Sequence, residues 1–175
     1  MKLESLAERV ELILSDVDGV MTDGSVVFDN QGIETKLFHI RDGLGIKLWR
    51  RAGYRFGMIT GRSSHIVRMR AAELGVDIVR QGVDDKLAVA EQIVAEAGLT
   101  PQQVCYVGDD LPDLPAMRYV GFAVAVADGS EDLRRAAHFV TTTPGGRGAL
   151  RETIELILKA QGRWDDLIQK YRGKG

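Results

Sequence analysis

The chain has 175 residues, of which 45% are hydrophobic and 27% charged, and its formal net charge is −2. These values are ordinary for one soluble domain, and the near-neutral charge argues against nucleic acid as the main partner. The single cysteine, Cys105, excludes an intramolecular disulfide, and no apolar run approaches the roughly 18 residues of a membrane helix. Because the start at Met1–Ser5 is unlike a signal peptide, we expect a single cytoplasmic domain, 1–175, without a membrane partner.

Strand-like apolar runs alternate with helix-like stretches along most of the chain. In chain order the pattern predicts strand 10–15, helix 43–52, strand 55–60, helix 63–74, strand 76–79, helix 85–97, strand 104–107, helix 112–118, strand 122–126, helix 130–137, strand 139–141 and helix 148–159. Strands that alternate with helices are typical of a parallel sheet covered on both faces. We therefore predict an α/β fold, a three-layer, doubly wound parallel sheet.

One segment interrupts this alternation directly after the first strand. Residues 25–28 and 34–40 are strand-like, and Asp29-Asn30-Gln31-Gly32 between them suits a tight turn. We expect a β-hairpin flap at about 24–40, with too little chain elsewhere for a cap domain. Much apolar surface on a hairpin favours contact with another subunit. Its apolar residues are Val26, Val27, Phe28, Leu37, Phe38 and Ile40.

Reactive side chains gather where the predicted strands end. Ligands of open α/β sheets bind at the carboxyl ends of the strands, so we expect these side chains to converge. Crowded carboxylates repel one another and favour a divalent cation, and their oxygens suit Mg²⁺. A hydroxyl and an ammonium beside that metal suit the oxygens of a phosphoryl group. The residues are Asp16 and Asp18 after the first strand, Thr60 and Gly61 at the second, Lys86 after the third, and Asp109 and Asp110 after the fourth.

Two of these carboxylates could perform the chemistry of phosphate monoester hydrolysis. A carboxylate can attack phosphorus and form an aspartyl-phosphate, and a second one can act as general acid and then as general base. Asp16 and Asp18 are both candidates, and the residues alone do not determine which of them attacks. Because this hydrolysis is among the slowest uncatalysed reactions, nucleophile, metal and acid–base group are all expected.

The chain resembles the haloacid dehalogenase (HAD) superfamily of hydrolases. Four motifs carry the resemblance in order: Asp16-Val17-Asp18-Gly19-Val20, Thr60-Gly61-Arg62, Lys86 and Gly108-Asp109-Asp110. Further segments are similar to the branch that hydrolyses 3-deoxy-D-manno-octulosonate 8-phosphate (KDO 8-phosphate). They are Arg41-Asp42-Gly43-Leu44-Gly45, Gln81-Gly82, 108–113, Val124-Ala125-Val126-Ala127-Asp128 and Pro144-Gly145-Gly146-Arg147-Gly148. The resemblance covers about residues 8–160 and implies a HAD-like, Rossmannoid fold and a Mg²⁺-dependent phosphatase.

The resemblance also implies a role for each motif residue. Asp16 would be the nucleophile and a metal ligand, and Asp18 the general acid and base with its backbone carbonyl on the metal. Asp109 would be the third protein ligand, supported by Asp110. The phosphoryl oxygens would be held by Thr60, Gly61 and Lys86. A homotetramer is implied as well, with the hairpins packed together, the active site covered by a neighbouring subunit and the loop 145–148 near an adjacent site.

Arginines are the candidates for substrate selectivity, because a sugar-acid phosphate carries a carboxylate beside its phosphate. Arg62 follows Gly61, Arg41 lies at the hairpin exit, and Arg70 is two helical turns beyond Arg62. A related branch acts on nine-carbon, sialic-acid-type (KDN/Neu5Ac) 9-phosphates and has a glutamate in place of Arg62. Arg62 therefore favours the eight-carbon substrate, whereas segments 67–70 and 83–86 resemble the nine-carbon branch and keep that alternative open.

Two alternatives from other classes also fit the residue types. A receiver-like phosphoaccepting signalling module combines an acidic cluster, Thr, Lys and Mg²⁺, but its phosphorylated Asp ends the third strand, where this chain has Val79-Arg80-Gln81. A HAD-fold subunit without activity is opposed by the presence of every motif residue. Asp113 could simply cap the helix after Pro112, and the loop 145–148 could be no more than a helix entry.

Overall fold

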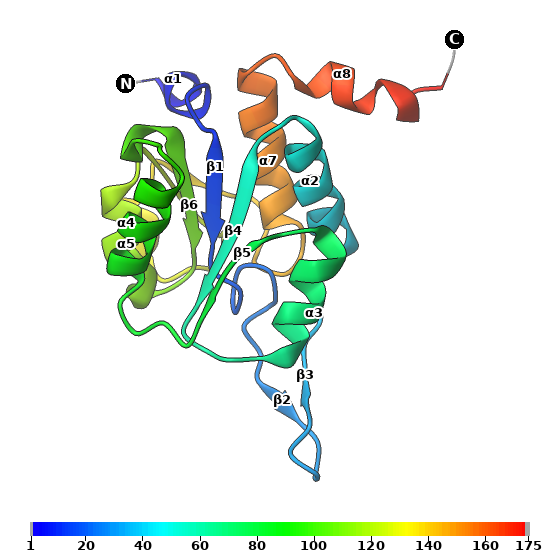
Figure 1. The fold of residues 1–175 in the computed structure, drawn as a ribbon, viewed down its shortest axis with the longest axis vertical. Helices are drawn as coiled ribbons and strands as arrows, with labels where there is room; N and C mark the ends of the chain where they lie inside the picture. The colour runs from blue at the N-terminus through cyan, green and yellow to red at the C-terminus, as the bar shows by residue number, and fades with distance from the viewer. Residues whose placement is uncertain (1, 174–175) are drawn as a thin grey trace.

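The computed structural model describes residues 2–173 and has a six-stranded sheet between two layers of helices (Figure 1). The strand order is β5-β4-β1-β6-β7-β8, and every neighbouring pair is parallel. This arrangement confirms the three-layer, doubly wound α/β fold. The strands are β1 Leu12–Ser15, β4 Arg55–Thr60, β5 Ile78–Gln81, β6 Val104–Gly108, β7 Phe122–Ala125 and β8 Phe139–Val140.

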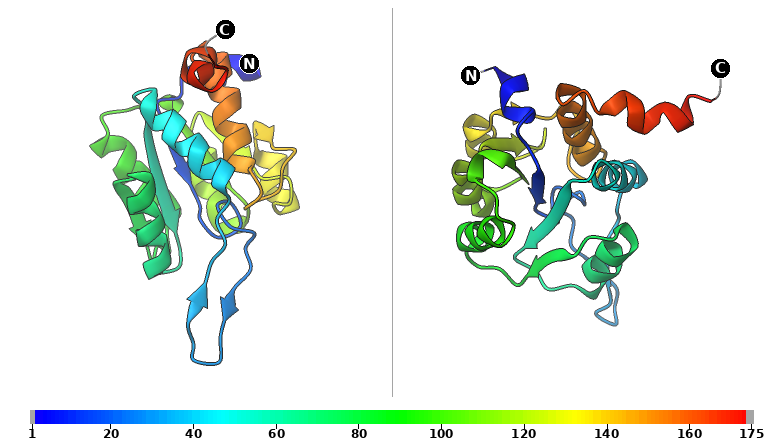
Figure 2. Two further views of the ribbon diagram at one scale, coloured as in Figure 1. Left: turned by 90° about the vertical axis from the view of Figure 1, so that its right-hand side faces the viewer. Right: turned by 45° about the horizontal axis from the view of Figure 1, so that its top comes forward.

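Helices cover both faces of the sheet (Figure 2). Along β1 the side chains alternate between the faces, so that Ile13 packs on one side, and Leu12 and Leu14 on the other. No helix within residues 2–173 is long and apolar enough to cross a membrane. One layer contains α2 Ile40–Arg51, α3 His65–Leu74 and α7 Ala149–Ala160, and the other contains α4 Lys86–Glu96, α5 Leu114–Tyr119 and α6 Glu131–Ala136.

Some elements differ from the predicted ranges for local reasons. Helix α2 begins at Ile40 rather than at residue 43, because Nδ1 of His39 accepts a hydrogen bond from the Arg41 N–H at 3.3 Å and caps the helix. The predicted helix 112–118 is divided into a 3₁₀ turn, Leu111–Asp113, and α5. A further 3₁₀ turn, Pro101–Gln103, precedes β6.

Two terminal helices were not predicted at all: α1 (Leu3–Ala7) and α8 (Trp164–Ile168), the latter followed by a 3₁₀ turn at Gln169–Tyr171. Helix α8 lies in the polar segment, about 163–175, for which the sequence predicts a mobile tail. The indole of Trp164 anchors it, with Arg151 5.0 Å from the ring centroid. Residues 174–175 of that segment lie outside the described residues.

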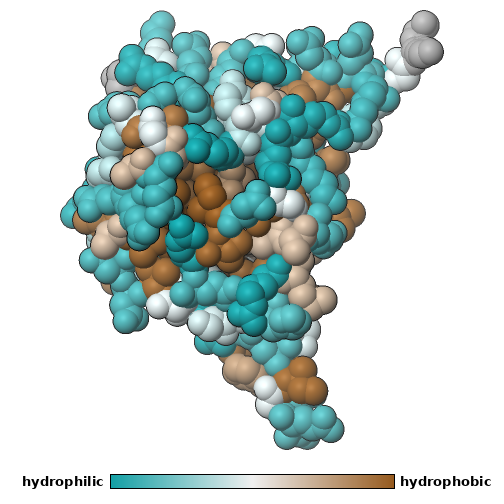
Figure 3. Space-filling model, viewed as in Figure 1, coloured by the Kyte–Doolittle hydropathy of each residue, from teal (hydrophilic) through white to brown (hydrophobic). Residues whose placement is uncertain are grey.

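The predicted hairpin is present, with β2 (Val27–Phe28) antiparallel to β3 (Glu34–Thr35). Its strands are shorter than predicted, and its turn is held by Asp29 Oδ1, which accepts from the N–H groups of Gln31 and Ile33. The hairpin projects from the end of the molecule at which β1 ends, opposite α1 and α8 (Figures 1 and 2). Figure 3 shows apolar side chains on this projection. Six apolar residues here are at least 50% exposed: Val26, Val27, Phe28, Ile33, Leu37 and Ile40.

Candidate active site

The order of the strands brings the ends of β1, β4 and β6 side by side. Strand β1 lies between β4 and β6. The sheet continues through β4 to β5 on one side of β1, and through β6 to β7 and β8 on the other. Ligands of such sheets bind at the carboxyl ends of the strands where the strand order reverses in this way. Asp16 directly follows β1, and its N–H donates to the Val107 carbonyl of β6 at 3.0 Å. Asp109 directly follows β6. The two carboxylates predicted as metal ligands therefore leave neighbouring strands at one edge.

Three carboxylates meet at this edge. Oxygens of Asp16, Asp109 and Asp113 lie within 4.8 Å of one another. Asp113 is fully buried and accepts hydrogen bonds from the Asp109 N–H at 3.0 Å and the Tyr106 hydroxyl at 2.8 Å. Asp113 thus both fixes the turn after β6 and completes the cluster, whereas its part in the site was left open on sequence grounds.

Lys86 is the cation of this cluster. Its Nζ lies 2.7 Å from Asp16 Oδ2 and 2.6 Å from Asp113 Oδ1, and the side chain is buried. The position follows from the start of α4, where the Asp85 side chain accepts from the Ala88 N–H at 3.0 Å and caps the helix. One ammonium faces three carboxylates, so the cluster has a negative excess where water has little access.

The pKa values of the carboxyl groups reflect this excess. Burial, together with the Asp113 carboxylate, raises the pKa of Asp16 to about 6 in spite of Lys86. Burial, Asp113 and Asp16 raise the pKa of Asp109 to about 8. Oxygen donors that are crowded enough to hold protons this strongly are suited to a hard divalent cation, so the residues present fit Mg²⁺.

Gly19 and the loop 145–148 shape the floor of the site. A Cβ at Gly19 would lie 2.0 Å from Asp109 Oδ2, and the residue has φ +91°, so only glycine fits here. Gly145 is packed just as closely, because a Cβ added at this position would lie 1.8 Å from the Gly19 carbonyl oxygen. The Gly146 N–H donates to the Val20 carbonyl at 2.8 Å. The loop therefore packs on the Asp16–Val20 loop of its own chain.

Thr60 ends β4 and is buried beside Asp18. Its hydroxyl lies 3.4 Å from Asp18 Oδ2 and accepts from the Arg62 N–H at 3.2 Å, with Gly61 exposed between them. Asp110 is also exposed, and its Oδ1 accepts from the Leu111 N–H at 2.8 Å. Thr60 thus joins the site, whereas the metal-supporting role of Asp110 stays a prediction.

The three candidate arginines differ in their placement. Arg62 reaches the hairpin, where its Nη2 lies 3.0 Å from Glu34 Oε1. Arg70 pairs with Glu73 at 2.7 Å, and Arg41 is exposed at the start of α2. Within residues 2–173, neither Arg41 nor Arg70 forms an ion pair or hydrogen bond with a side chain of the cluster. Their predicted contact with substrate stays a prediction.

Two hairpin residues next to the site were missed on sequence grounds. The Lys36 ammonium contacts Asp18 Oδ1 and lies 3.2 Å from Glu34 Oε1. Glu34 is in β3 and Lys36 directly follows that strand, and their side chains contact each other. Two oppositely charged residues two positions apart in the predicted strand 34–40 were the available signal.

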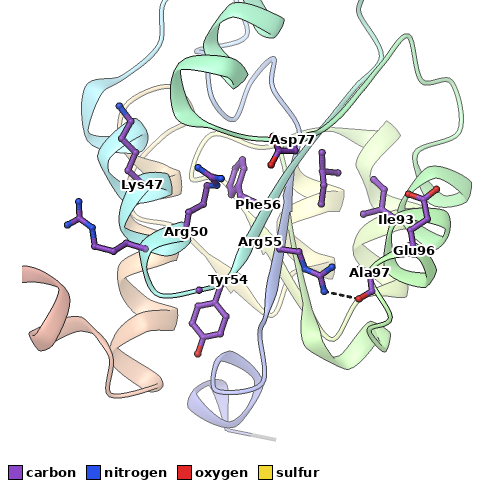
Figure 4. A pocket seen from close by; sticks show the side chains of 12 residues that line it. Lys47, Arg50, Tyr54, Arg55, Phe56, Asp77, Ile93, Glu96 and Ala97 are labelled. Carbon is purple, nitrogen blue, oxygen red and sulfur yellow. Dashed lines mark hydrogen bonds between the residues drawn. The ribbon is translucent and has the colours of Figure 1, made fainter.

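Two cavities of the described residues lie away from the carboxylate cluster. Figure 4 shows one of about 740 Å³ at the amino ends of β4 and β5, the opposite edge of the sheet. Two of its three arginines bind helix ends: Arg55 donates to the Ala97 carbonyl at 2.8 Å (Figure 4), and Arg50 donates to the Leu74 carbonyl at 3.0 Å. Another, of about 810 Å³, lies along α7 and includes Arg41 and Arg147. Neither is lined by Asp16, Asp109 or Lys86.

The raised pKa values predict how the stability of the protein depends on pH in EDTA. Asp16 and Asp109 bind protons more tightly in the folded chain than in the unfolded one, so their contribution to stability falls as pH rises from about 4 to about 8. Mg²⁺ competes with these protons, so it should raise Tm more at pH 8 than at pH 6. Thermal unfolding with and without Mg²⁺ measures this. Asp109→Asn should abolish the Mg²⁺ effect and the exposed Asp84→Asn should not; equal Mg²⁺ shifts in both variants would contradict the assignment.

Comparison with known proteins places this site in a family. A sequence profile of haloacid dehalogenase-like hydrolases matches residues 40–121. KDO 8-phosphate phosphatase KdsC of Yersinia pestis is 45% identical over 157 residues, which cover 90% of this chain and 84% of that protein. The crystal structure of the Moraxella catarrhalis KDO 8-phosphate phosphatase in complex with magnesium ion, phosphate ion and KDO has a TM-score of 0.95 at 41% identity and covers 97% of both chains.

The parallel sheet, with carboxylates after β1 and β6 and a lysine opening α4, defines the general class as a haloacid dehalogenase-like hydrolase. The 45% sequence identity to the Yersinia pestis protein extends over 90% of this chain, so the similarity goes beyond a shared fold. The chain belongs to the KDO 8-phosphate phosphatase family. The receiver-like alternative is not favoured, since β5 ends at Gln81 without a carboxylate.

Proposed function

We propose that this protein is a Mg²⁺-dependent phosphomonoesterase that hydrolyses KDO 8-phosphate to KDO and phosphate. The observation that carries the proposal is the Moraxella catarrhalis complex with magnesium, phosphate and KDO, which matches this chain over 97% of its length. The cluster of Asp16, Asp109 and Asp113 supplies oxygen donors for the same metal. A cytoplasmic location is proposed with it, since KDO 8-phosphate is a charged metabolite.

The proposed reaction has two steps. In the first, an Asp16 carboxylate oxygen bonds to phosphorus while the ester bond to the sugar breaks, and Asp18 donates a proton to the departing oxygen. In the second, Asp18 removes a proton from water, which attacks phosphorus and displaces Asp16, so that phosphate leaves. Lys86 lies 2.7 Å from Asp16 and Thr60 3.4 Å from Asp18, so both can donate to phosphoryl oxygens.

Mg²⁺ in this scheme offsets the charge of the phosphoryl oxygens and of the carboxylates. Asp16 and Asp109 would hold it through their side chains and Asp18 through its backbone carbonyl. This use of the backbone is compatible with the Asp18 side chain, which is turned toward Lys36 and Thr60. Activity should disappear in excess EDTA and return with Mg²⁺.

Substrate choice is tested by kinetics on KDO 8-phosphate, a sialic-acid-type 9-phosphate and glucose 6-phosphate in parallel. We expect kcat/KM to be highest for KDO 8-phosphate, by about 100-fold or more over the hexose phosphate, because only a sugar acid offers a carboxylate to the cations near the site. A preference for the nine-carbon substrate would establish the alternative, and no turnover of any of the three would contradict the proposal.

We also propose a homotetramer in which hairpins pack together and a neighbouring subunit covers the site. Six apolar side chains at the hairpin, each at least 50% exposed, support this, whereas Phe38 is half-buried against the core of its own chain. Sedimentation should give an assembly well above the 19.2 kDa of one chain. Phe28→Glu, at the hairpin, should dissociate it and reduce turnover, whereas Met69→Glu, at an exposed position of α3, should do neither. A fully active monomer at micromolar concentration would overturn this proposal.

A further inference from the structure

Glu34 on β3 is a meeting point for donors from two parts of the chain. Its Oε1 lies 3.2 Å from the Lys36 ammonium and 3.0 Å from Arg62 Nη2, and its Oε2 accepts from the Ser64 hydroxyl at 2.7 Å. Arg62 and Ser64 belong to the loop between β4 and α3. The second strand of the projecting hairpin is thereby tied to the rim of the site, next to Thr60.

These contacts also keep Glu34 charged. Hydrogen bonds from Ser64, Arg62 and Lys36 lower the pKa of its carboxyl group, Ser64 having the largest effect. Its side chain is 15% exposed and that of Lys36 is 1% exposed. Burying the long Lys36 side chain in this way costs much of its rotamer entropy. We therefore expect its ammonium to make stronger contacts than an ordinary ion pair on the surface.

Lys36 also touches the acid–base group of the proposed reaction. Its ammonium contacts Asp18 Oδ1, while the Thr60 hydroxyl lies 3.4 Å from Asp18 Oδ2. The Asp18 carboxylate is therefore held between the hairpin and β4. An ammonium has three N–H donors, and Asp18 and Glu34 occupy two of them, so one donor remains for a further oxygen.

The geometry points to a role for residues 34–36, β3 and the lysine that follows it, as a wall of the active site. We propose that Lys36 donates a hydrogen bond to a substrate oxygen beside the scissile ester, and that Glu34 is a positioning residue that aims Lys36 and Arg62. The proposal rests on the proposed function, because Asp18 must reach the ester oxygen to protonate it. Any oxygen next to that ester, such as a sugar hydroxyl, then comes within reach of the Lys36 ammonium.

The experiment compares Lys36→Met and Glu34→Gln with Thr35→Ala; Thr35 lies between these two residues in the chain and is exposed. The substrates are KDO 8-phosphate and p-nitrophenyl phosphate, which has no hydroxyl beside its ester and a leaving group that needs little protonation. Lys36→Met should lower kcat/KM about 10–100-fold on KDO 8-phosphate and less than about threefold on p-nitrophenyl phosphate. Thr35→Ala should stay within about twofold on both.

Glu34→Gln should raise KM for KDO 8-phosphate about fivefold or more with a smaller change in kcat, since the cations remain but are less well aimed. If Glu34 acts through Lys36 and Arg62, Glu34→Gln should cause no further loss in a variant that already carries Lys36→Met and Arg62→Met. Multiplied losses would overturn the positioning role. An equal loss of Lys36→Met on both substrates, or behaviour like that of Thr35→Ala, would overturn the contact with the substrate.

Two further measurements keep these outcomes interpretable. Thermal unfolding shows whether the variants fold, and Lys36→Arg, which keeps the charge and donors, should recover at least part of the activity if Lys36→Met unfolds. Failure of this rescue in a folded protein would count against the proposal. The wild-type protein serves as the separate test of function, because loss of turnover there would contradict the proposed phosphatase rather than the role of β3.

Discussion

Asp16→Asn is expected to reduce turnover of KDO 8-phosphate by about 10³-fold or more while leaving the protein folded. The substitution removes the attacking oxygen of the proposed aspartyl-phosphate and one metal ligand, and losses of this size follow from removing a nucleophile. Asparagine has nearly the same shape, so packing against β6 should persist. Steady-state kinetics with saturating Mg²⁺ measures the effect.

Stability provides the internal control for this variant. Asp16 lies in a cluster whose negative excess raises its own pKa to about 6, so an uncharged side chain relieves repulsion from Asp113 while weakening the pairing of Lys86. We expect the two effects to offset one another within about 1 kcal/mol in EDTA. Retention of more than a few per cent of activity in a clean preparation would refute Asp16 as the nucleophile.

Lys86→Met is expected to have the largest effect on stability. The substitution leaves the buried carboxylates of Asp16 and Asp113 without their cation, and breaking a buried ion pair from one side costs about 3–5 kcal/mol. Urea unfolding in EDTA at pH 8 measures the loss. Because the uncompensated carboxyls can bind protons instead, the loss should be smaller at pH 6.

A matched control for this prediction is Arg80→Met. Arg80 pairs with Glu96 at 3.1 Å on the surface, with both side chains partly exposed, and such pairs are worth at most about 1 kcal/mol. Mg²⁺ should recover part of the Lys86→Met loss, since it binds the folded cluster. A loss no larger than that of Arg80→Met would contradict the role assigned to Lys86.

The sheet and the residues at its edge could be predicted because parallel strands buried on both faces produce unmistakable apolar runs. Strand β4 was predicted at its observed bounds, Arg55–Thr60, and polar residues directly after such runs mark the edge that binds ligands. Asp16, Thr60 and Asp109 were therefore located correctly relative to the fold. Their chemical roles stay predictions until the variants are measured.

What could not be predicted depends on contacts between distant segments. The contact of Lys36 with Asp18 and the pairing of Glu34 with Arg62 both depend on how the hairpin lies against the loops after β1 and β4. Asp113 reaches the cluster because a 3₁₀ turn follows β6. Helix α8 is too short for a periodic pattern, and its anchor, Trp164, is one of only a few apolar residues in a mainly polar segment.

The pairing of β1 with β6 determines when the metal site can exist during folding. Leu12 lies opposite Val104, and Ser15 opposite Val107, so the strands that carry Asp16 and Asp109 are remote in sequence although adjacent in the sheet. Pairings of this kind form slowly, because the long intervening chain must be ordered first. A growing chain that has not yet reached β6 holds Asp16 without its partner. The metal site is therefore complete only once the chain from β1 through Asp109 has folded, so the reactive centre cannot form on a shorter piece of the chain.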